Sequence, residues 1–341
     1  MTIVYVTHPR FIEHDLAGHP EHAGRIRAVW QRLEEGGLAA RMRSIELPLA
    51  APEQMRAVHH ESYLAVLERT ASFDRTVRLD ADTYVCPTSY EVARLAAGGG
   101  AAAAQAVVLG QARAGLAVLR PPGHHAEPER GMGFCLLNNI AIAARAAQAA
   151  GAARVFIVDI DVHHGNGTEA AFYADDTVLF LSLHQYPLYP GTGHVDEIGR
   201  GAGTGYTINI PIPPGEGDPA YAALFEQIVW PAAARFHPDL ILVSVGFDAH
   251  WADPLAGMRL SLSGYGHLCA ELIRMANDLC AGRIVFFMEG GYNLDALSYG
   301  ICNIARLLLG ERIVDPLGPA SAQTDGQIAA LIERLKGVHQ L

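Results

Sequence analysis

Short apolar runs that alternate with longer helical patterns constrain the fold of this chain more than any other feature. Seven such runs are nearly continuous, which is typical of strands buried on both faces of a parallel sheet. We expect these strands at residues 3–6, 116–119, 154–159, 178–183, 206–210, 240–245 and 284–288. We expect helices at about 22–36, 89–110, 137–150, 167–174, 219–236, 262–281, 292–309 and 325–336. The pattern predicts an α/β protein with a central parallel sheet and helices on both faces.

Four polar clusters directly follow predicted strands. They are His124-His125, the run from Asp159 to His163, Asp248, and the run from Glu289 to Tyr292. A parallel sheet of this kind carries its sites just beyond the carboxyl ends of the strands. If the strands are parallel, all four clusters lie on the same rim of the sheet. The sequence therefore predicts a functional site at this rim.

Asp161, His163 and Asp248 are the metal ligands that the residues indicate. In an extended segment, the Asp-x-Asp-x-His alternation places Asp159, Asp161 and His163 on one side of the chain. Two carboxylates and one imidazole with open positions suit a catalytic Zn²⁺, and would also accept Fe²⁺ or Co²⁺. The alternative is a buried ion pair between Asp161 and His163 without a metal. That alternative leaves the other clusters unexplained.

His124 and His125 are the candidate acid–base groups. They follow the stiff turn Arg120-Pro121-Pro122-Gly123, which would hold both rings against the site. Hydrolysis of an amide at a metal needs a base for the attacking water and an acid for the leaving nitrogen. Asp159 and Asn166 are available as backing groups that would split the two pKa values. A purely structural histidine pair is the alternative.

Tyr292 is the candidate donor to the reacting carbonyl. It follows Gly290 and Gly291, which let the backbone bring a phenol close to a small site. Its hydroxyl would donate to the developing oxyanion opposite the metal. A packing tyrosine is the ordinary alternative for such a turn.

The composition favours one large domain. Of the 341 residues half are hydrophobic, and no linker or charge block divides them. We expect a single domain over residues 1–341, with a core at about 1–310 and a helical tail at about 311–341. The five cysteines have no C-x-x-C spacing, which argues against a disulfide framework and a cysteine zinc cage. The formal net charge of −11 disfavours direct nucleic-acid binding and is compatible with a cationic substrate.

The chain carries no recognisable targeting or membrane signal. Its first residues lack a basic region followed by a long apolar stretch. No run approaches the roughly 20 apolar residues that span a bilayer. We expect a soluble, cytoplasmic protein without membrane contact. A homo-oligomer is compatible with the sequence.

In the stretches that contain the four polar clusters, the chain resembles the histone deacetylase / acetylpolyamine amidohydrolase family. The matching stretches are Arg120 to His125, Gly131 to Asn139, Asp159 to Gly167, Tyr189 to Gly193, Gly246 to Asp248 and Glu289 to Leu294. They occur in the family's order, and the resemblance covers roughly residues 1–310. Asn139, Asn166 and Glu289 make the chain similar to the class II branch and its bacterial relatives.

The resemblance implies an arginase-like α/β fold and zinc-dependent hydrolysis of an acylated amine. By position, His124 would be the buried histidine, hydrogen-bonded to Asp159. His125 would be the general base and acid, supported by Asn166. Tyr292 would polarise the substrate carbonyl together with the zinc.

The resemblance also implies a narrow tunnel around the alkyl chain of the substrate. Phe134 and Tyr189 would form its walls, where they would remove the chain from water. Gly133 would allow the loop to approach closely. Plain core packing is the alternative for the two rings. Asp82 would contact the substrate backbone at the rim.

Structural potassium is a further implication of the resemblance. One K⁺ would sit behind the zinc, using Asp159, Asp161, His163, Ser182 and Leu183. A second monovalent-ion site is implied near Phe172, Asp175, Val178 and Tyr206.

Two substrates compete within this class: acetyl-lysine in a protein or peptide, and an acetylated polyamine. In polyamine-selective class II relatives, a glutamate lies seven positions after the zinc aspartate. Here that position is Leu255, which favours an acyl-lysine or a broad acyl-amine substrate. An acidic gate formed by Glu13, Asp15 and Glu21, or by a second subunit, would favour the polyamine.

Two other classes are weaker alternatives. A binuclear manganese ureohydrolase shares the general fold but needs a further aspartate where this chain has Gly165. A non-catalytic binding protein with a degenerate site is the other alternative. Every catalytic position here holds a competent residue, which disfavours it.

Overall fold

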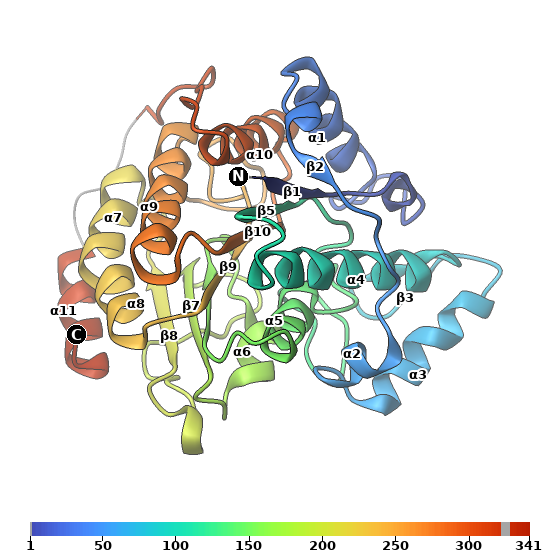
Figure 1. The fold of residues 1–341 in the computed structure, drawn as a ribbon, viewed down its shortest axis with the longest axis horizontal. Helices are drawn as coiled ribbons and strands as arrows, with labels where there is room; N and C mark the ends of the chain where they lie inside the picture. The colour runs from blue at the N-terminus through green and yellow to red at the C-terminus, as the bar shows by residue number, and fades with distance from the viewer. Residues whose placement is uncertain (1, 322–327) are drawn as a thin grey trace.

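The computed structural model describes residues 2–321 and 328–341 (Figure 1). Its centre is an eight-stranded sheet in the order β2-β1-β5-β10-β9-β6-β7-β8, and every neighbouring pair is parallel. The strands are β1 (Ile3–Val6), β2 (Arg43–Ser44), β5 (Ala114–Ala117), β6 (Val155–Asp159), β7 (Val178–Gln185), β8 (Thr207–Ile212), β9 (Leu240–Val245) and β10 (Ile284–Met288). The predicted parallel α/β sheet is confirmed.

Helices cover both faces of this sheet (Figure 1). The α-helices are α1 (Gly24–Glu35), α2 (Pro52–Arg56), α3 (Glu61–Arg69), α4 (Ser89–Val108), α5 (Asn139–Ala149), α6 (Asn166–Phe172), α7 (Asp218–Leu224), α8 (Trp230–Phe236), α9 (Leu262–Cys280), α10 (Leu294–Leu308) and α11 (Ile328–His339). Short 3-10 helices are η1 (Pro9–Ile12), η2 (Ala39–Arg41), η3 (Thr70–Ser72) and η4 (Gly201–Gly203). Helices α4 and α5 pack on each other, and α1, α10, α9 and α7 form a second series of packed neighbours.

The central strands are buried from end to end. Every residue of β6, β9 and β10 is buried. Because helices remove both faces of these strands from water, both faces must be apolar, and this produces the uninterrupted Val, Ile, Leu and Phe runs. The polar residues are therefore confined to the strand ends.

The predicted helix at 219–236 is interrupted. The chain is helical throughout, but a π turn, η5 (Phe225–Val229), separates α7 from α8. Pro231, in the first turn of α8, has no backbone N–H to donate, so the regular bonding pattern cannot run through it. The last predicted helix, 325–336, is observed as Ile328–His339, and its residues 325–327 lie outside the described part of the chain.

The segment between α1 and α4 contains elements that the pattern did not predict. These are β2, α2, α3 and a two-stranded antiparallel sheet of β3 (Val77–Arg78) and β4 (Tyr84–Val85). Strands of two residues are too short to show a hydrophobic period. Their positions depend on pairing with distant chain, as in the contact of β2 with β1.

Close packing explains the three glycines in the middle of α4. A Cβ on Gly98 would lie 2.0 Å from the carbonyl oxygen of Pro48, and one on Gly100 would lie 2.7 Å from the ring of Phe287. Glycine lowers helix stability by about 1 kcal/mol relative to alanine. Here it allows the 47–50 segment and β10 to approach the helix.

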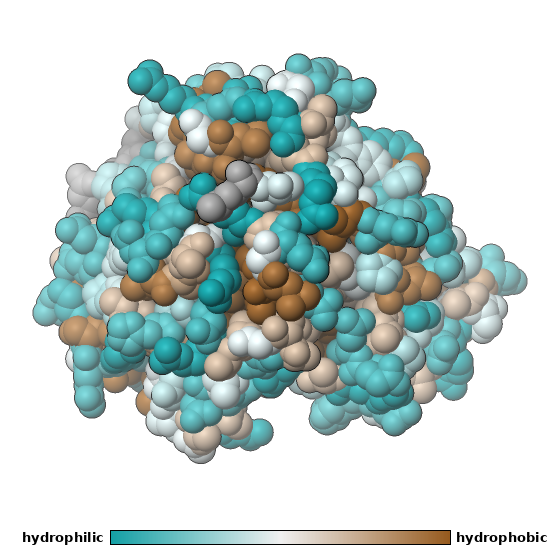
Figure 2. Space-filling model, in the orientation of Figure 1, coloured by the Kyte–Doolittle hydropathy of each residue, from teal (hydrophilic) through white to brown (hydrophobic). Residues whose placement is uncertain are grey.

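The visible surface is mainly hydrophilic. Figure 2 shows one face of the molecule, on which hydrophobic residues gather only in separate patches. Within residues 2–321 and 328–341, none of the helices combines the length and apolar character needed to cross a membrane.

Candidate active site

The four polar clusters lie at the ends of four strands that are consecutive in the sheet. These strands are β5, β10, β9 and β6, in that spatial order. The register places Asp159 beside Ser244 and Met288 beside Val245, so the strands end at similar heights. The polar residues that follow them are thus brought to one rim, as the parallel arrangement predicted.

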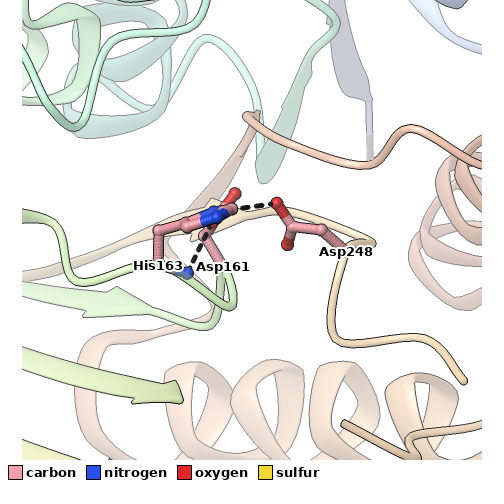
Figure 3. Close-up of side chains that lie close together, drawn as sticks. All are labelled: Asp161, His163 and Asp248. Atoms are coloured by element: carbon pink, nitrogen blue, oxygen red, sulfur yellow. Dashed lines mark hydrogen bonds and ion pairs between the residues drawn. The ribbon is translucent and has the colours of Figure 1, made fainter. Parts of the chain in front are cut away.

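Asp161, His163 and Asp248 meet at this rim (Figure 3). Each offers a ligand atom, and these atoms all lie within 4.8 Å of one another. The Nδ1 atom of His163 is 3.1 Å from Asp161 Oδ1 and 3.3 Å from Asp248 Oδ2. Both carboxylates are completely buried. Within the described residues, this is the one group of His, Cys, Asp and Glu side chains with metal-ligand spacing.

The arrangement fits a divalent cation better than a simple ion pair. The buried Oδ2 of Asp248 makes no hydrogen bond, although it lies near His163. An unbonded carboxylate oxygen, buried next to a second buried carboxylate, is costly unless a cation compensates it. Gly246 and Gly290 leave room around the oxygens: an added Cβ would lie 1.9 Å from Asp161 Oδ2 and 2.0 Å from Asp248 Oδ2, respectively. A Zn²⁺ held by these three residues would retain open positions.

The histidine pair stands beside the triad with two different backing groups. His124 Nδ1 lies 3.0 Å from Asp159 Oδ2, and His125 Nδ1 lies 2.7 Å from Asn166 Oδ1. Burial lowers the pKa of His124, but the nearby carboxylates, Asp159 first and then Asp161, together outweigh burial and raise the pKa above its ordinary value. Burial, reinforced by His124 and His163, lowers the pKa of His125 well below 6.5. Near neutral pH His125 is a neutral imidazole that can accept a proton.

Two distant residues hold the backbone around Tyr292. Arg25 donates to the carbonyl oxygens of Glu289 at 2.5 Å and Gly291 at 2.8 Å. From the other side, Asp253 Oδ2 accepts the N–H of Tyr292 at 2.7 Å and that of the next residue at 3.1 Å. Burial raises the pKa of the Tyr292 phenol well above 10, so the phenol keeps its proton and is available as a donor.

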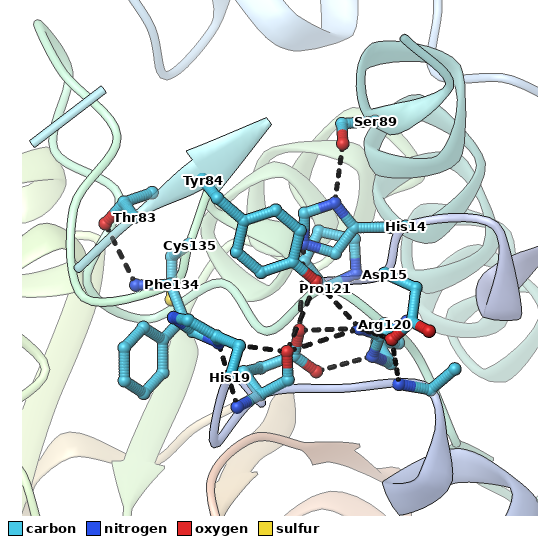
Figure 4. A network of polar contacts seen from close by, with 12 residues as sticks. His14, Asp15, His19, Thr83, Tyr84, Ser89, Arg120, Pro121, Phe134 and Cys135 are labelled. Carbon is cyan, nitrogen blue, oxygen red and sulfur yellow. Dashed lines mark hydrogen bonds and ion pairs between the residues drawn. The ribbon is translucent and has the colours of Figure 1, made fainter. Parts of the chain in front are cut away.

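A buried polar network around Arg120 lies beside the site (Figure 4), and its carboxylate Glu21 also pairs with Arg25. Glu21 is fully buried, 3.2 Å from Arg25 Nη1 and 2.5 Å from Arg120 Nε. Arg120 also donates to the hydroxyl of Tyr84 at 3.1 Å. Two guanidinium groups outweigh burial and lower the pKa of Glu21 to about 2. The suggestion that Glu21 forms part of an acidic gate is therefore wrong, because its carboxylate does not reach the surface.

Aromatic rings surround the acid–base groups. The ring of Phe134 is 5.9 Å from that of Tyr292, and the ring of Tyr189 is 5.2 Å from that of His125. Tyr189 is 36% exposed, which places it at the outer end of this group. Gly133 has φ +55°, and a Cβ there would lie 2.4 Å from the ring of His125. The loop can press against His125 only because position 133 has no side chain.

Asp82 and Leu255 lie in loops next to these rings. Thr83 joins the two sides of this region, since its hydroxyl donates to Asp82 Oδ1 at 3.2 Å and accepts from the Phe134 N–H at 3.1 Å. Figure 4 shows the bond between Thr83 and Phe134. Leu255 is 38% exposed, and its N–H donates to Asp253 Oδ1 at 3.0 Å. Thr83 thus connects Asp82 to Phe134, and Asp253 connects Leu255 to Tyr292.

The first implied K⁺ site shares Asp161 and His163 with the triad, and the second lies near the amino ends of β7 and β8. Ser182 is the register partner of Asp159 across β6 and β7, and its hydroxyl contacts His184 Nδ1 at 3.0 Å. In the second group, Asp175 forms an ion pair with Arg145 at 2.7 Å, and the same guanidinium lies 4.7 Å from the ring centroid of Phe172. Leu183, Val178 and Tyr206 belong to or adjoin β7 and β8. Both ions stay predictions.

Three site-supporting residues were not found from the sequence. They are Arg25, Asp253 and Glu127, whose carboxylate contacts Asn166. Asp253 lies five residues after Asp248, and Glu127 lies two residues after His125. Their proximity in the chain to these site residues could have indicated a supporting role. Arg25 lies four residues after Glu21, but its contact with a glycine 266 residues away could not be predicted from the sequence.

A parallel α/β sheet that carries this triad, a histidine pair and a half-buried tyrosine on its carboxyl rim has the features of a metal-dependent hydrolase. A family model described as the histone deacetylase domain matches residues 19–308. The chain belongs to the histone deacetylase family, and its predicted membership is confirmed.

Several relatives are similar to this chain over most of its length. Histone deacetylase 14, chloroplastic, from Arabidopsis thaliana is 42% identical, covering 87% of this chain and 74% of the relative. Histone deacetylase 10, chloroplastic, from Oryza sativa subsp. japonica is 40% identical, covering 99% and 81%. A probable deacetylase from Archaeoglobus fulgidus is 40% identical, covering 89% and 86%.

A crystal structure of the HDA15 HD domain superimposes with a TM-score of 0.91 at 35% identity, covering 99% of this chain and 96% of that one. The arginase-like deacetylase fold is thereby confirmed. Family membership supports a hydrolase that removes acetyl groups from an acetylated substrate.

Proposed function

We propose that this chain is a zinc-dependent deacylase that hydrolyses the amide of acetyl-lysine in proteins or peptides. The observation that carries the proposal is the meeting of Asp161, His163 and Asp248 beside His125 and Tyr292 on one rim. The buried, unbonded Asp248 Oδ2 supports a cation at this point. Asn166 and Glu289 are the residue types found at these positions in the class II branch, which supports placing this chain in that branch.

The protein groups divide the chemistry between them. Bound Zn²⁺ would supply Lewis acidity, which polarises a carbonyl and activates water. His125 accepts the proton of the attacking water and later delivers it to the leaving amine nitrogen. His124, backed by Asp159, remains a fixed neighbouring charge. Tyr292 donates its O–H to the developing oxyanion, which it can do because its raised pKa keeps the phenol protonated.

The rim favours a neutral acyl-lysine chain over a polyamine. Position 255 carries an exposed leucine instead of an acid. Of the three acidic residues near the entrance, Glu21 is buried, and Glu13 pairs with Arg10 at 3.0 Å. Asp15 accepts the N–H of Ala23 at 2.7 Å. Burial keeps Glu21 from a distal ammonium group, and Glu13 and Asp15 each already have a neighbouring donor.

Direct competition between substrates tests the proposal. Zinc-loaded protein is offered acetyl-lysine peptides and N-acetylated polyamines side by side, and acetate release is measured. We expect the peptides to be preferred by kcat/KM, and Asp248→Ala to lose both zinc and turnover. Asp278→Ala, an exposed aspartate on α9, is the matched control and should leave both unchanged. A large preference for polyamines would overturn the substrate, and a zinc-free active Asp248→Ala protein would overturn the site.

Structural K⁺ and a cytoplasmic location complete the proposal. The K⁺ ligands would be Asp159, Asp161, His163, Ser182 and Leu183, with a second ion near Phe172, Asp175, Val178 and Tyr206. The substrate tunnel would have Phe134 and Tyr189 as walls, and Asp82 as the acceptor for substrate backbone.

A further inference from the structure

Glu127 lies directly behind the amide that contacts His125. Asn166 Oδ1 is 2.7 Å from His125 Nδ1, and Asn166 Nδ2 donates to Glu127 Oε1 at 2.7 Å. The imidazole, the amide and the carboxylate thus form a continuous series of hydrogen bonds. His125 and Asn166 are buried, and the side chain of Glu127 retains 26% exposure.

An asparagine side chain can occupy its site in two orientations that differ by a half-turn. In one orientation it presents an acceptor oxygen to its neighbour, and in the other it presents a donor nitrogen. A carboxylate is an acceptor only. Glu127 therefore requires the NH₂ end of Asn166, and the oxygen end must face His125.

This orientation decides where His125 carries its proton. Against an acceptor oxygen, Nδ1 must be the protonated nitrogen, so the lone pair is left on Nε2. In the described part of the chain, Nε2 of His125 has no hydrogen-bond partner, while the ring lies 5.8 Å from that of His163. The reversed amide would move the proton to Nε2 and remove the base from the site.

Glu127 is itself held in place by a tight turn. Its N–H donates to the carbonyl oxygen of Arg130 at 2.9 Å, and the guanidinium of Arg130 donates to Oε2 at 2.9 Å. His59 Nδ1 lies 3.0 Å from the carbonyl oxygen of Glu127. Oε1 is thereby directed at Asn166. The other contact of the amide, Met132 Sδ at 3.4 Å, is a weak acceptor that does not compete with a carboxylate.

We infer that Glu127 is a positioning residue that selects the amide orientation of Asn166 and, through it, the basic tautomer of His125. This inference rests on the proposed function, because the orientation set by Glu127 affects catalysis only if His125 is the general base. Glu127 does not contact the reacting atoms. Its effect is expected in kcat and not in KM.

The first experiment removes the acceptor behind Asn166. Glu127→Ala should lower kcat about 10- to 100-fold with little change in KM or zinc content, as is typical when a buried supporting bond is lost. Glu129→Ala is the matched control, since it removes the same charge from the same turn. The Glu129 side chain is 75% exposed and its ion-pair partner is His60 at 3.3 Å. A kcat of Glu127→Ala within twofold of this control would overturn the inference.

A second pair of variants distinguishes orientation from mere stability. Asn166→Asp alone would place two carboxylates 2.7 Å apart and should lower kcat strongly. When Glu127→Gln is added to Asn166→Asp, the amide introduced at position 127 can donate to the new carboxylate, which still presents an acceptor to His125. The double variant should recover at least tenfold over Asn166→Asp. Failure of this rescue would overturn the role in orientation.

The third measurement does not depend on activity. Selective ¹⁵N labelling of histidine reports which ring nitrogen of His125 is protonated. We expect Nδ1–H in the unmodified protein and in Glu129→Ala, and loss of this single form in Glu127→Ala. If no acyl-amine is hydrolysed but the tautomer changes, the proposed function fails and the positioning by Glu127 stands. An unchanged tautomer in Glu127→Ala would overturn the inference whatever the activity.

Discussion

At the scale of single residues, Tyr292 illustrates how a small site obtains a fixed donor. Its backbone is held by Arg25 on one side and Asp253 on the other, and its ring lies 5.9 Å from Phe134. The backbone that carries the phenol is therefore held from two directions. Since preorganised donors act at the point where charge develops, this arrangement suits stabilisation of an oxyanion.

Tyr292→Phe tests this role directly. Removing only the hydroxyl should lower kcat about 100- to 1000-fold, the usual effect of losing one oxyanion donor. Zinc content and folding should be unchanged, because the ring and both backbone contacts remain. The assay is acetate release with metal analysis of the same sample.

Tyr299→Phe is the control for this substitution. Tyr299 lies on α10 with the guanidinium of Arg32 3.5 Å from its ring centroid, outside the candidate site. It should keep full turnover. Unchanged turnover in Tyr292→Phe would remove the tyrosine from the chemistry.

At the scale of secondary-structure elements, the start of α5 is joined to the turn that holds Glu127. Asn138 caps the helix by accepting from the Ala141 N–H at 3.0 Å. The N–H of Asn138 donates to His59 Nε2 at 2.9 Å, and His59 Nδ1 faces the carbonyl oxygen of Glu127. His59 must be neutral to make both bonds. Burial accordingly lowers the pKa of His59 from 6.5 to about 4.

The two hydrogen bonds of neutral His59 predict that the stability of the protein depends on pH. Between pH 6.5 and 4 the unfolded chain protonates His59 while the folded chain does not, so the unfolded state binds more protons. The stabilisation is present above pH 6.5 and is lost as the pH falls toward 4. Between pH 7 and pH 5 this site should account for a loss of about 1–2 kcal/mol in the free energy of unfolding.

Urea unfolding at pH 7 and pH 5 measures this effect. His59→Gln should show a smaller difference between the two pH values than the unmodified protein. His60→Gln, which alters the neighbouring 60%-exposed histidine, is the control and should retain the full difference. Equal differences in all three proteins would contradict the assigned role of His59.

At the scale of the whole molecule, the candidate metal site joins loops that follow three neighbouring strands. Asp161 follows β6 and Asp248 follows β9, and Val162 donates to Asp248 Oδ1 at 3.0 Å. Gly290, after β10, donates to Asp161 Oδ2 at 2.8 Å. Two buried carboxylates at this junction repel each other, and a bound cation would replace that repulsion by attraction.

Metal removal should therefore destabilise the molecule as a unit. A ligand that binds only the folded state at about 1000 times its Kd contributes about 4 kcal/mol. We expect zinc to raise the melting temperature by several degrees over chelator-treated protein, with full reversal on adding zinc back. Calorimetry is the measurement. Asp248→Asn should abolish the zinc-dependent shift, and a normal shift in that variant would place the metal elsewhere.

Much of the fold and of the candidate site could be predicted because the signals are local. The strands β6, β9 and β10 were predicted within a residue at each end, since buried parallel strands produce unbroken apolar runs. The parallel strand direction placed His125 and the triad on the same rim, and the strand order then made them neighbours. Short elements such as β2 and α2 carry no such signal, and the π turn before Pro231 does not change the apolar pattern.

The sequence by itself determined the strands, their common direction and the reactive residues at their ends, because each depends on residues close together in the chain. Only the tertiary structure decided the strand order, which makes β5, β10, β9 and β6 neighbours. It also decided that Glu21 is buried under two guanidinium groups, and that Glu127 faces the amide behind His125. These are contacts between side chains distant in the chain, whose cost and gain depend on packing and burial that no local pattern records.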